Sequence, residues 1–177
     1  MNTLQAIYTR HTTHKYNGKA PSEEQLQTLL KAARASAIGG GKFDTMHITV
    51  IRNAEFLQAW EESAAAQIGR PGIHPLYGAP VLILISGILS GTPADNPVYS
   101  NGACMVENMT LASTELGLGA THIWGIVNAL NADPELKAKL AIPEGFTPIC
   151  GMASGYTDEV FEEREIPEDK ITTVFFD

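Results

Sequence analysis

The stretch Asn101–Gly119, NGACMVENMTLASTELGLG, predicts the element around which the rest of the chain packs. Small and apolar side chains lie nearly all round the helix that this stretch would form. A helix of that kind is buried on most sides, so we expect it to lie between other elements or between subunits. Gly117 and Gly119 are suited to stop it, because glycine readily takes the left-handed conformation that follows many helices.

Further helices are predicted on both sides of this stretch. Ser22 and Gln25 stand at the spacing of a capping box, and a stripe of leucines follows them, which predicts a helix that runs to about Ala35. Other predicted helices cover residues 2–9, ending near Arg10, residues 56–64, and the segment from residue 134 that Asp133 and Pro134 introduce.

Strands are predicted where short apolar or alternating runs occur. These runs are residues 46–53, 81–86, 146–154 and 171–176, with a short strand or turn at 120–125. The run VLILIS at 81–86 is apolar throughout, so we expect its strand to be covered on both faces. Helices and strands alternate irregularly, which indicates an α/β or α+β domain with helices covering a sheet. No linker or repeat divides residues 1–177, so we expect one domain.

The composition narrows the class of protein. The chain has 177 residues, 44% of them hydrophobic, and a net charge of −8, which argues against a nucleic acid or an anionic membrane as partner. The longest apolar run, Ala79–Leu89, has 11 residues, whereas a membrane span needs about 20. No signal-peptide pattern opens the chain. We expect a cytoplasmic protein in which Cys104 and Cys150 are buried free thiols.

The seven residues Arg10–Tyr16, RHTTHKY, concentrate cations and hydroxyls in an acidic chain. An arginine fork and threonine hydroxyls suit a phosphate. Judged on these residues alone, a solvated loop after a helix is the favoured explanation of the cluster, ahead of a phosphate site. A metal site built on His11 and His14 is less expected, because no CxxC or HExxH spacing and no further ligands accompany them.

Two glycine-containing segments also attract attention. Gly39–Lys42, GGGK, lacks the Walker spacing, so it is either a backbone that approaches a ligand closely or a flexible loop. The segment ELGLGATHIWG ends at Trp124-Gly125, where backbone N–H groups could face a planar heterocycle or simply begin another element. No GxSxG motif occurs and neither cysteine has a basic neighbour, so no catalytic nucleophile is predicted.

Taken together, four segments resemble the nitroreductase family of FMN-dependent, NAD(P)H-using oxidoreductases. They are IYTRHTTHKYNGKAPSEEQLQTLLKAARAS, ACMVENMTLASTELGLGATHIWG, IPEGFTPICGMASGY and EREIPEDKI, in the family's order across nearly the whole chain. The resemblance implies an α+β fold with a central, mostly antiparallel sheet covered by helices. It also implies an intertwined homodimer with FMN at the interface.

The resemblance assigns roles to matching positions. Residues implied to hold the FMN phosphate and ribityl chain are Arg10, His11, Thr12, His14 and Arg164. A histidine at position 14, where the family usually has arginine or lysine, would make binding sensitive to pH. Trp124 and Gly125 match the backbone pair that faces the isoalloxazine ring. No catalytic residue and no metal is implied, because the flavin performs the chemistry.

One segment departs from the family. Where the family commonly reads Pro-Ser-x-x-Asn-x-Gln-Pro-Trp, this chain reads SAIGGGKFDTMH, with Gly41 near the asparagine position. Backbone amides of Gly39, Gly40 and Gly41, or the Lys42 side chain, would replace the lost side-chain contacts, and Lys42 would stabilise the anionic reduced flavin. Alternatively, the segment no longer touches the cofactor.

The implied activity is hydride transfer from NAD(P)H through FMN to a small acceptor such as a nitroaromatic or a quinone, in ping-pong order. A flavin-binding storage or sensor protein without turnover is the alternative that the altered GGGK segment suggests. A chain that has lost flavin binding altogether is a second alternative.

Overall fold

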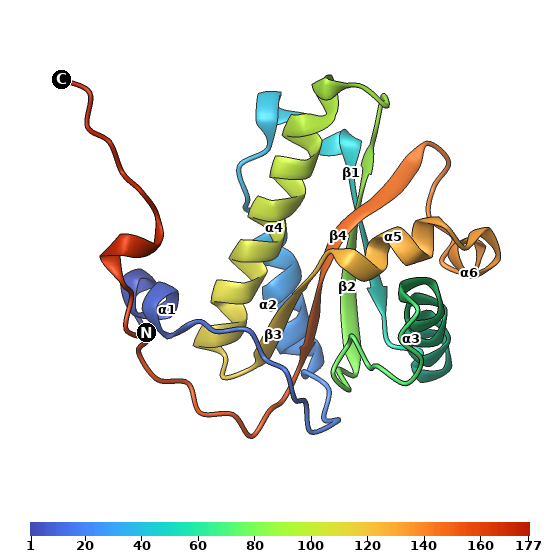
Figure 1. Ribbon diagram of the computed structural model, residues 1–177, viewed down its shortest axis with the longest axis horizontal. Helices are drawn as coiled ribbons and strands as arrows, with labels where there is room; N and C mark the ends of the chain where they lie inside the picture. The colour runs from blue at the N-terminus through green and yellow to red at the C-terminus, as the bar shows by residue number, and fades with distance from the viewer.

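The computed structural model describes residues 1–177 and is built on one antiparallel sheet. Its four strands are β1 (Met46–Ile51), β2 (Val81–Ile88), β3 (Gly119–Ile123) and β4 (Phe146–Gly155), in the order β1-β2-β4-β3. Every neighbouring pair is antiparallel, so β1 and β3 form the two edges. The predicted α+β class, with a sheet covered by helices, is confirmed (Figure 1).

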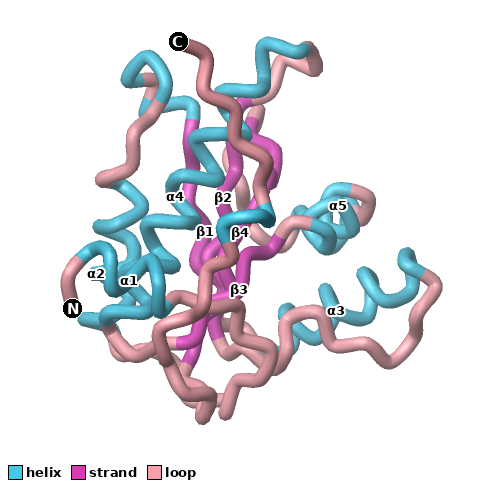
Figure 2. Tube along the Cα trace, turned by 60° about the vertical axis from the view of Figure 1, so that its left-hand side comes forward, coloured by secondary structure: helices cyan, strands magenta, loops and turns pink.

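Helices cover both faces of the sheet. On one face lie α2 (Glu23–Arg34) and α4 (Asn96–Glu115), with the short α1 (Thr3–Thr9) packed on α4. On the other face lie α3 (Ala54–Ile68), α5 (Gly125–Asn131) and α6 (Pro134–Ala138), as Figures 1 and 2 show. Alternate residues of β2 enter the two hydrophobic clusters on either side, Ile83 with α2 and α4, and Leu84 with α3 and α5. The prediction that β2 is covered on both faces is therefore confirmed.

Helix α4 is the central helix that the sequence predicts, although it begins five residues earlier, at Asn96. It lies close to β4 because residue 102 is glycine: a Cβ there would come 2.8 Å from both Cys150 Sγ and Ile149 Cδ1. It ends as predicted, with Gly117 in the left-handed region at φ +67°. The predicted capping box of Ser22 and Gln25 likewise begins α2.

Two predictions about the fold are wrong, and one helix was not predicted. Helix α5 was not anticipated, because its seven residues are too few to display a helical period. Residues 171–176 form no strand, because no strand of their own chain lies beside them; this segment extends away from the body in Figure 1. Cys104 is exposed, since it lies on the one stripe of α4 that faces away from the sheet, whereas Cys150 is buried as predicted.

No helix of the structure is both long enough and apolar enough to cross a membrane.

Candidate flavin site

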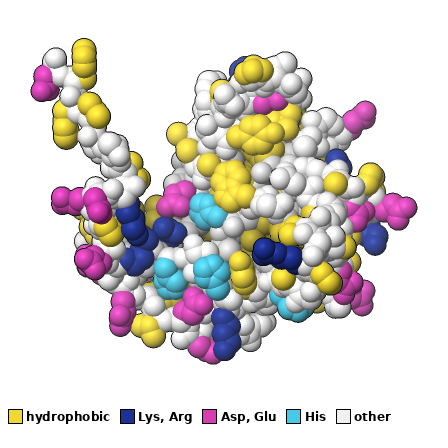
Figure 3. Space-filling model, viewed as in Figure 1, with side chains coloured by type: hydrophobic (Ala, Val, Ile, Leu, Met, Phe, Trp, Pro, Cys, Tyr) yellow, Lys and Arg dark blue, Asp and Glu magenta, His cyan; other side chains and the backbone are white.

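The cluster Arg10–Tyr16 lies along the free edge of β3. Thr13 is fully buried, its backbone N–H donates to the Ala120 carbonyl at 3.0 Å, and its own carbonyl accepts from the Thr121 hydroxyl. The buried Tyr16 hydroxyl bonds to Thr121 Oγ1 at 2.8 Å. The segment is therefore anchored to the sheet at Thr13 and Tyr16, whereas Thr12, His14 and Lys15 are exposed. Figure 3 shows basic and histidine side chains gathered on this face, with acidic side chains between them.

Arg10 has a guanidinium that is only partly engaged. Its Nε lies 3.9 Å from Oε1 of Glu107 on α4, and its terminal nitrogens make no hydrogen bond within the chain. The neighbouring Thr12 hydroxyl also has no partner within the chain, and its side chain is exposed. Free, planar N–H donors beside a free hydroxyl fit the phosphate group of FMN.

One acidic residue, Glu159, contacts both histidines of the cluster, through the ring of His11 and the backbone of His14. His11 Nε2 lies 3.2 Å from Glu159 Oε2, and the His14 backbone N–H donates to Glu159 Oε1 at 3.2 Å. The imidazole of His11 also packs on Phe161, with ring centroids 4.8 Å apart. The His14 ring meets Tyr77 edge-on at 4.9 Å. The rings thus point to different neighbours, and no group of three or more potential metal ligands occurs in the structure.

Arg164 links the C-terminal segment, residues 156–177, to the end of α1. Its guanidinium donates to the Ile7 carbonyl at 3.1 Å and to the Tyr8 carbonyl at 3.2 Å, and its backbone N–H donates to Tyr8 at 3.0 Å. Its charge also reaches Glu107. Arg10 and Arg164, from opposite ends of the chain, therefore both act electrostatically on the Glu107 carboxylate.

Glu107 is the acidic centre of this group. Its Oε2 lies 3.1 Å from Nε2 of His122 on β3. The hydrogen bond from His122, together with the charges of Arg10 and Arg164, holds the pKa of the Glu107 carboxyl below its usual value, against the effect of partial burial. Glu107 was not among the site residues predicted from the sequence. Glu107 and Glu115 are the only charged residues in the 20 residues of α4, and that isolation was the available signal.

Trp124 and Gly125 lie where β3 ends and α5 begins. The Trp124 side chain is 45% exposed, and a Cβ added at Gly125 would meet no atom within 4 Å. Behind them, the buried Trp60 donates from Nε1 to the Ile126 carbonyl at 2.8 Å, which fixes the start of α5. The accessible backbone at Trp124 and Gly125, supported by the hydrogen bond from Trp60, is suited to lie against one edge of a planar ring.

The loop of Gly40, Gly41 and Lys42 lies near the first turns of α4. Its preceding residue, Gly39, donates its N–H to Oδ1 of the buried Asn101 at 2.9 Å. Gly40 and Gly41 have φ values of +65° and +67°, which glycine adopts without strain. The loop lines a cavity of about 600 Å³ that includes neither Arg10 nor Trp124. Within one chain, this predicted part of the site is separate from the rest.

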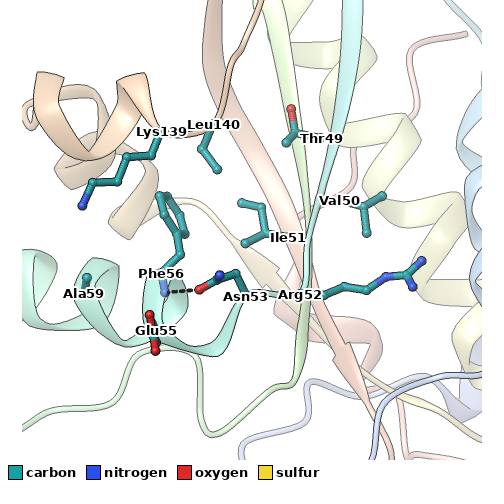
Figure 4. A pocket seen from close by; sticks show the side chains of 10 residues that line it. All are labelled: Thr49, Val50, Ile51, Arg52, Asn53, Glu55, Phe56, Ala59, Lys139 and Leu140. Carbon is teal, nitrogen blue, oxygen red and sulfur yellow. Dashed lines mark hydrogen bonds between the residues drawn. The ribbon is translucent and has the colours of Figure 1, made fainter.

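Two other features offer no comparable chemistry. Two basic side chains, Arg52 and Lys139, line the cavity of about 450 Å³ beside edge strand β1, but Figure 4 shows them pointing in opposite directions. Arg52 is paired with Glu23 at 2.9 Å. Burial raises the pKa of the Cys150 thiol to about 12, so this cysteine is not a thiolate nucleophile near neutral pH.

Residues 7–156 match the model of the Nitroreductase family, so the chain belongs to the nitroreductase family, as the sequence resemblance predicts. It is 30% identical over 167 residues to a protein of Methanothermobacter thermautotrophicus provisionally named NADH dehydrogenase/NAD(P)H nitroreductase, covering 90% of this chain and 79% of that one. It is 26% identical to an NADPH-flavin oxidoreductase of Vibrio harveyi, covering 89% and 67%. The fold matches a nitroreductase with bound FMN from Desulfitobacterium hafniense with a TM-score of 0.83, at 23% identity over 99% and 100% of the two chains.

Proposed function

We propose that the protein is an FMN-dependent oxidoreductase that passes a hydride from NAD(P)H through FMN to a small acceptor such as a nitroaromatic or a quinone. The observation that carries this proposal is the free fork of Arg10, fixed beside the same strand that ends at Trp124-Gly125. Family membership and the names of the relatives support it. A cytoplasmic location, where NAD(P)H is supplied, is part of the proposal.

Bound FMN would supply the two-electron chemistry, and the chain would supply position and charge. Arg10 and Thr12 would hold the phosphate, with His11 and His14 beside them. Arg164 keeps the end of α1 and the C-terminal segment together around this group. The backbone at Trp124 and Gly125 would lie against one edge of the ring. No side chain is assigned a proton-transfer or nucleophilic role.

The second part of the proposal is a homodimer that completes the site. The C-terminal segment exposes apolar side chains that its own chain does not cover, among them Val174 at 83%, Phe175 at 86% and Phe176 at 100% exposure. Such side chains mark a surface that another protein covers. A second copy is the natural partner, and its Gly40–Lys42 loop would approach the ring that Trp124 of the first copy faces.

The contact surface on α4 differs from the one that its methionines suggest. From the sequence alone, the apolar residues around Met105 and Met109 suggest a subunit contact on this helix. Both are buried against the sheet of their own chain, with 3% and 0% exposure, so they leave nothing for a partner. The half-exposed stripe of α4 instead includes Ala103, Leu111 and Ala112, and we assign the contact to this stripe and the C-terminal segment.

The decisive experiment follows oxidation of NADH and of NADPH by the FMN-loaded protein, with and without a quinone or a nitroaromatic compound. We expect sustained oxidation that depends on both FMN and the acceptor. Reduction of FMN without turnover of any acceptor would favour the storage or sensor protein. Failure to take up FMN would show that flavin binding has been lost and would overturn the proposal.

A further inference from the structure

A carboxylate next to an expected phosphate site requires an explanation. Glu107 Oε1 lies 3.9 Å from Arg10 Nε, and the Glu107 side chain is 44% exposed. A carboxylate repels a phosphate a few ångströms away. The Glu107 carboxylate, beside the arginine that would bind the phosphate, would therefore weaken the binding of an anion if it did nothing else. Glu107 is also one of only two charged residues in α4, so it does not belong to a generally charged helix face.

The side of Arg10 that Glu107 contacts resolves the conflict. The carboxylate approaches Nε, and the terminal nitrogens keep their hydrogens free. A guanidinium binds phosphate best through two parallel N–H donors, which requires its plane to be held in one orientation. At 3.9 Å this contact is an ion pair too long for a hydrogen bond, so the charge of the carboxylate draws the Nε edge of the guanidinium toward Glu107 and leaves the opposite edge for the ligand. In this geometry Glu107 orients Arg10 and does not block it.

Glu107 is itself fixed by His122. The His122 Nε2 lies 3.1 Å from Glu107 Oε2 and 3.1 Å from Thr110 Oγ1. The Thr110 hydroxyl donates to the Val106 carbonyl at 2.9 Å, so its oxygen accepts from Nε2 and the Nε2 atom carries a hydrogen. The remaining charged group that acts on Glu107 is Arg164, which is tied to the α1 carbonyls.

We propose that Glu107, held by His122, is the positioning residue that orients Arg10 toward the phosphate of FMN. This inference rests on the proposed function. His122 lies on β3, which ends at Ile123 just before Trp124, so β3 then positions both ends of the flavin site: it leads directly into the backbone beside the ring, and it acts on the phosphate-binding arginine through His122 and Glu107.

The test compares FMN with riboflavin, which has the same ring and ribityl chain but no phosphate. We expect Glu107→Gln to raise the dissociation constant for FMN on the order of tenfold, the lower end of the effect of removing a residue that orients a metal ligand. Riboflavin binding should not change. In an Arg10→Ala background, Glu107→Gln should no longer weaken FMN binding, because the group that it orients is gone.

Matched variants separate positioning from a general effect of charge or stability. Glu115→Gln removes the other carboxylate of α4, which contacts the N-terminal amine at 2.7 Å, and should leave both dissociation constants unchanged. His122→Asn should weaken FMN binding as Glu107→Gln does, and His122→Gln, which retains an N–H near the Nε2 position, should restore it. The His122 pair also provides the test if Glu107→Gln does not fold.

Each alternative outcome is distinct. Equal weakening of FMN and riboflavin would mean a structural role for Glu107 and would overturn the inference. Tighter FMN binding in Glu107→Gln would mean that Glu107 competes with the phosphate, which also overturns it. Unchanged FMN binding in Glu107→Gln and His122→Asn would remove the inference and leave the proposed function intact. A wild-type protein that binds neither flavin would overturn the proposed function, and this inference with it.

Discussion

Arg164 donates from Nε to the carbonyl of Tyr8 at 3.2 Å, across 156 positions of the sequence. A second bond, from Nη2 to the Ile7 carbonyl, and a third from the Arg164 backbone place the C-terminal segment against the last turn of α1. The unpaired carbonyls at the end of a helix are thereby satisfied by a cation, the arrangement that the helix dipole favours. The residues on either side of this contact, including Arg10, acquire their positions from both ends of the chain.

Arg164→Ala should release the C-terminal segment. It removes two side-chain hydrogen bonds of about 0.5–1.5 kcal/mol each. Of the bonds that Arg164 itself makes, only the backbone bond to Tyr8 remains. Limited proteolysis should cleave after residue 157 faster than in the wild type, while the rest of the domain resists. Arg34→Ala, which removes an exposed arginine of α2, is the control. Equal cleavage rates in all three proteins would contradict the anchoring role.

Arg10→Ala should weaken FMN binding by roughly 1.5–3 kcal/mol, the usual size of a hydrogen bond to a charged group. Riboflavin should bind as before, because it lacks the phosphate. Fluorescence titration of the flavin-free protein measures both constants. Arg52→Ala is the matched control, since Arg52 pairs with Glu23 at the opposite edge of the sheet. Unchanged FMN affinity in Arg10→Ala would exclude Arg10 from the site.

Trp60 should be among the side chains that stabilise the domain most. It is fully buried and its Nε1 donates to the Ile126 carbonyl in α5. Trp60→Ala should lower the free energy of unfolding by about 3–5 kcal/mol, and Trp60→Phe by about 1–3 kcal/mol, because the buried carbonyl loses its donor. Urea denaturation measures both. A change of less than a few tenths of a kcal/mol in Trp60→Phe would show that the Nε1 hydrogen bond is unimportant.

The Glu107 carboxyl should make stability depend on pH in acid. Its pKa is lower in the folded protein than in the unfolded chain, so it stabilises the fold above the unfolded value of about 4.5 and loses that effect as pH falls through the folded pKa. Below about pH 4.5, the unfolding free energy of the wild type should therefore fall more steeply than that of Glu107→Gln. Parallel curves for the two proteins, measured by denaturation across the acid range, would contradict this coupling.

Residues 165–177 of the C-terminal segment should be required for dimerisation and dispensable for folding. All side chains of residues 165–177 are exposed, so their removal takes nothing from the core of one chain. Sedimentation at micromolar concentration should show a dimer for the full chain and a folded monomer for the chain that ends at residue 164. A full-length monomer would contradict the shared site.

Much of the fold could be predicted because its signals are local. The uninterrupted VLILIS run predicts a strand with two covered faces, and the spacing of Ser22 and Gln25 predicts a helix start, whatever the rest of the chain does. Helix α5 could not be predicted in this way, because its stability comes from burial against α3 and from Trp60. The β-like sequence at 171–176 was misleading for the opposite reason: a strand needs a neighbour, and its own chain provides none.

The candidate site shows the same contrast between local sequence signals and contacts between distant segments. Arg10, Thr12 and Trp124 were proposed from motifs, and the structure shows the first two with free polar groups and the third accessible. Glu107, His122 and Glu159 gain their significance only when α4, β3 and the C-terminal segment come together. Pairing across such distances in the sequence leaves no pattern in a single chain.

The most direct test of the account is a visible absorbance spectrum of the FMN-loaded protein during anaerobic addition of NADH or NADPH, followed by a quinone. We predict a flavin band that stays with the protein through gel filtration, bleaches with one equivalent of at least one nicotinamide, and returns when the quinone is added. A protein that does not retain FMN, or whose flavin band neither nicotinamide bleaches, would contradict the account.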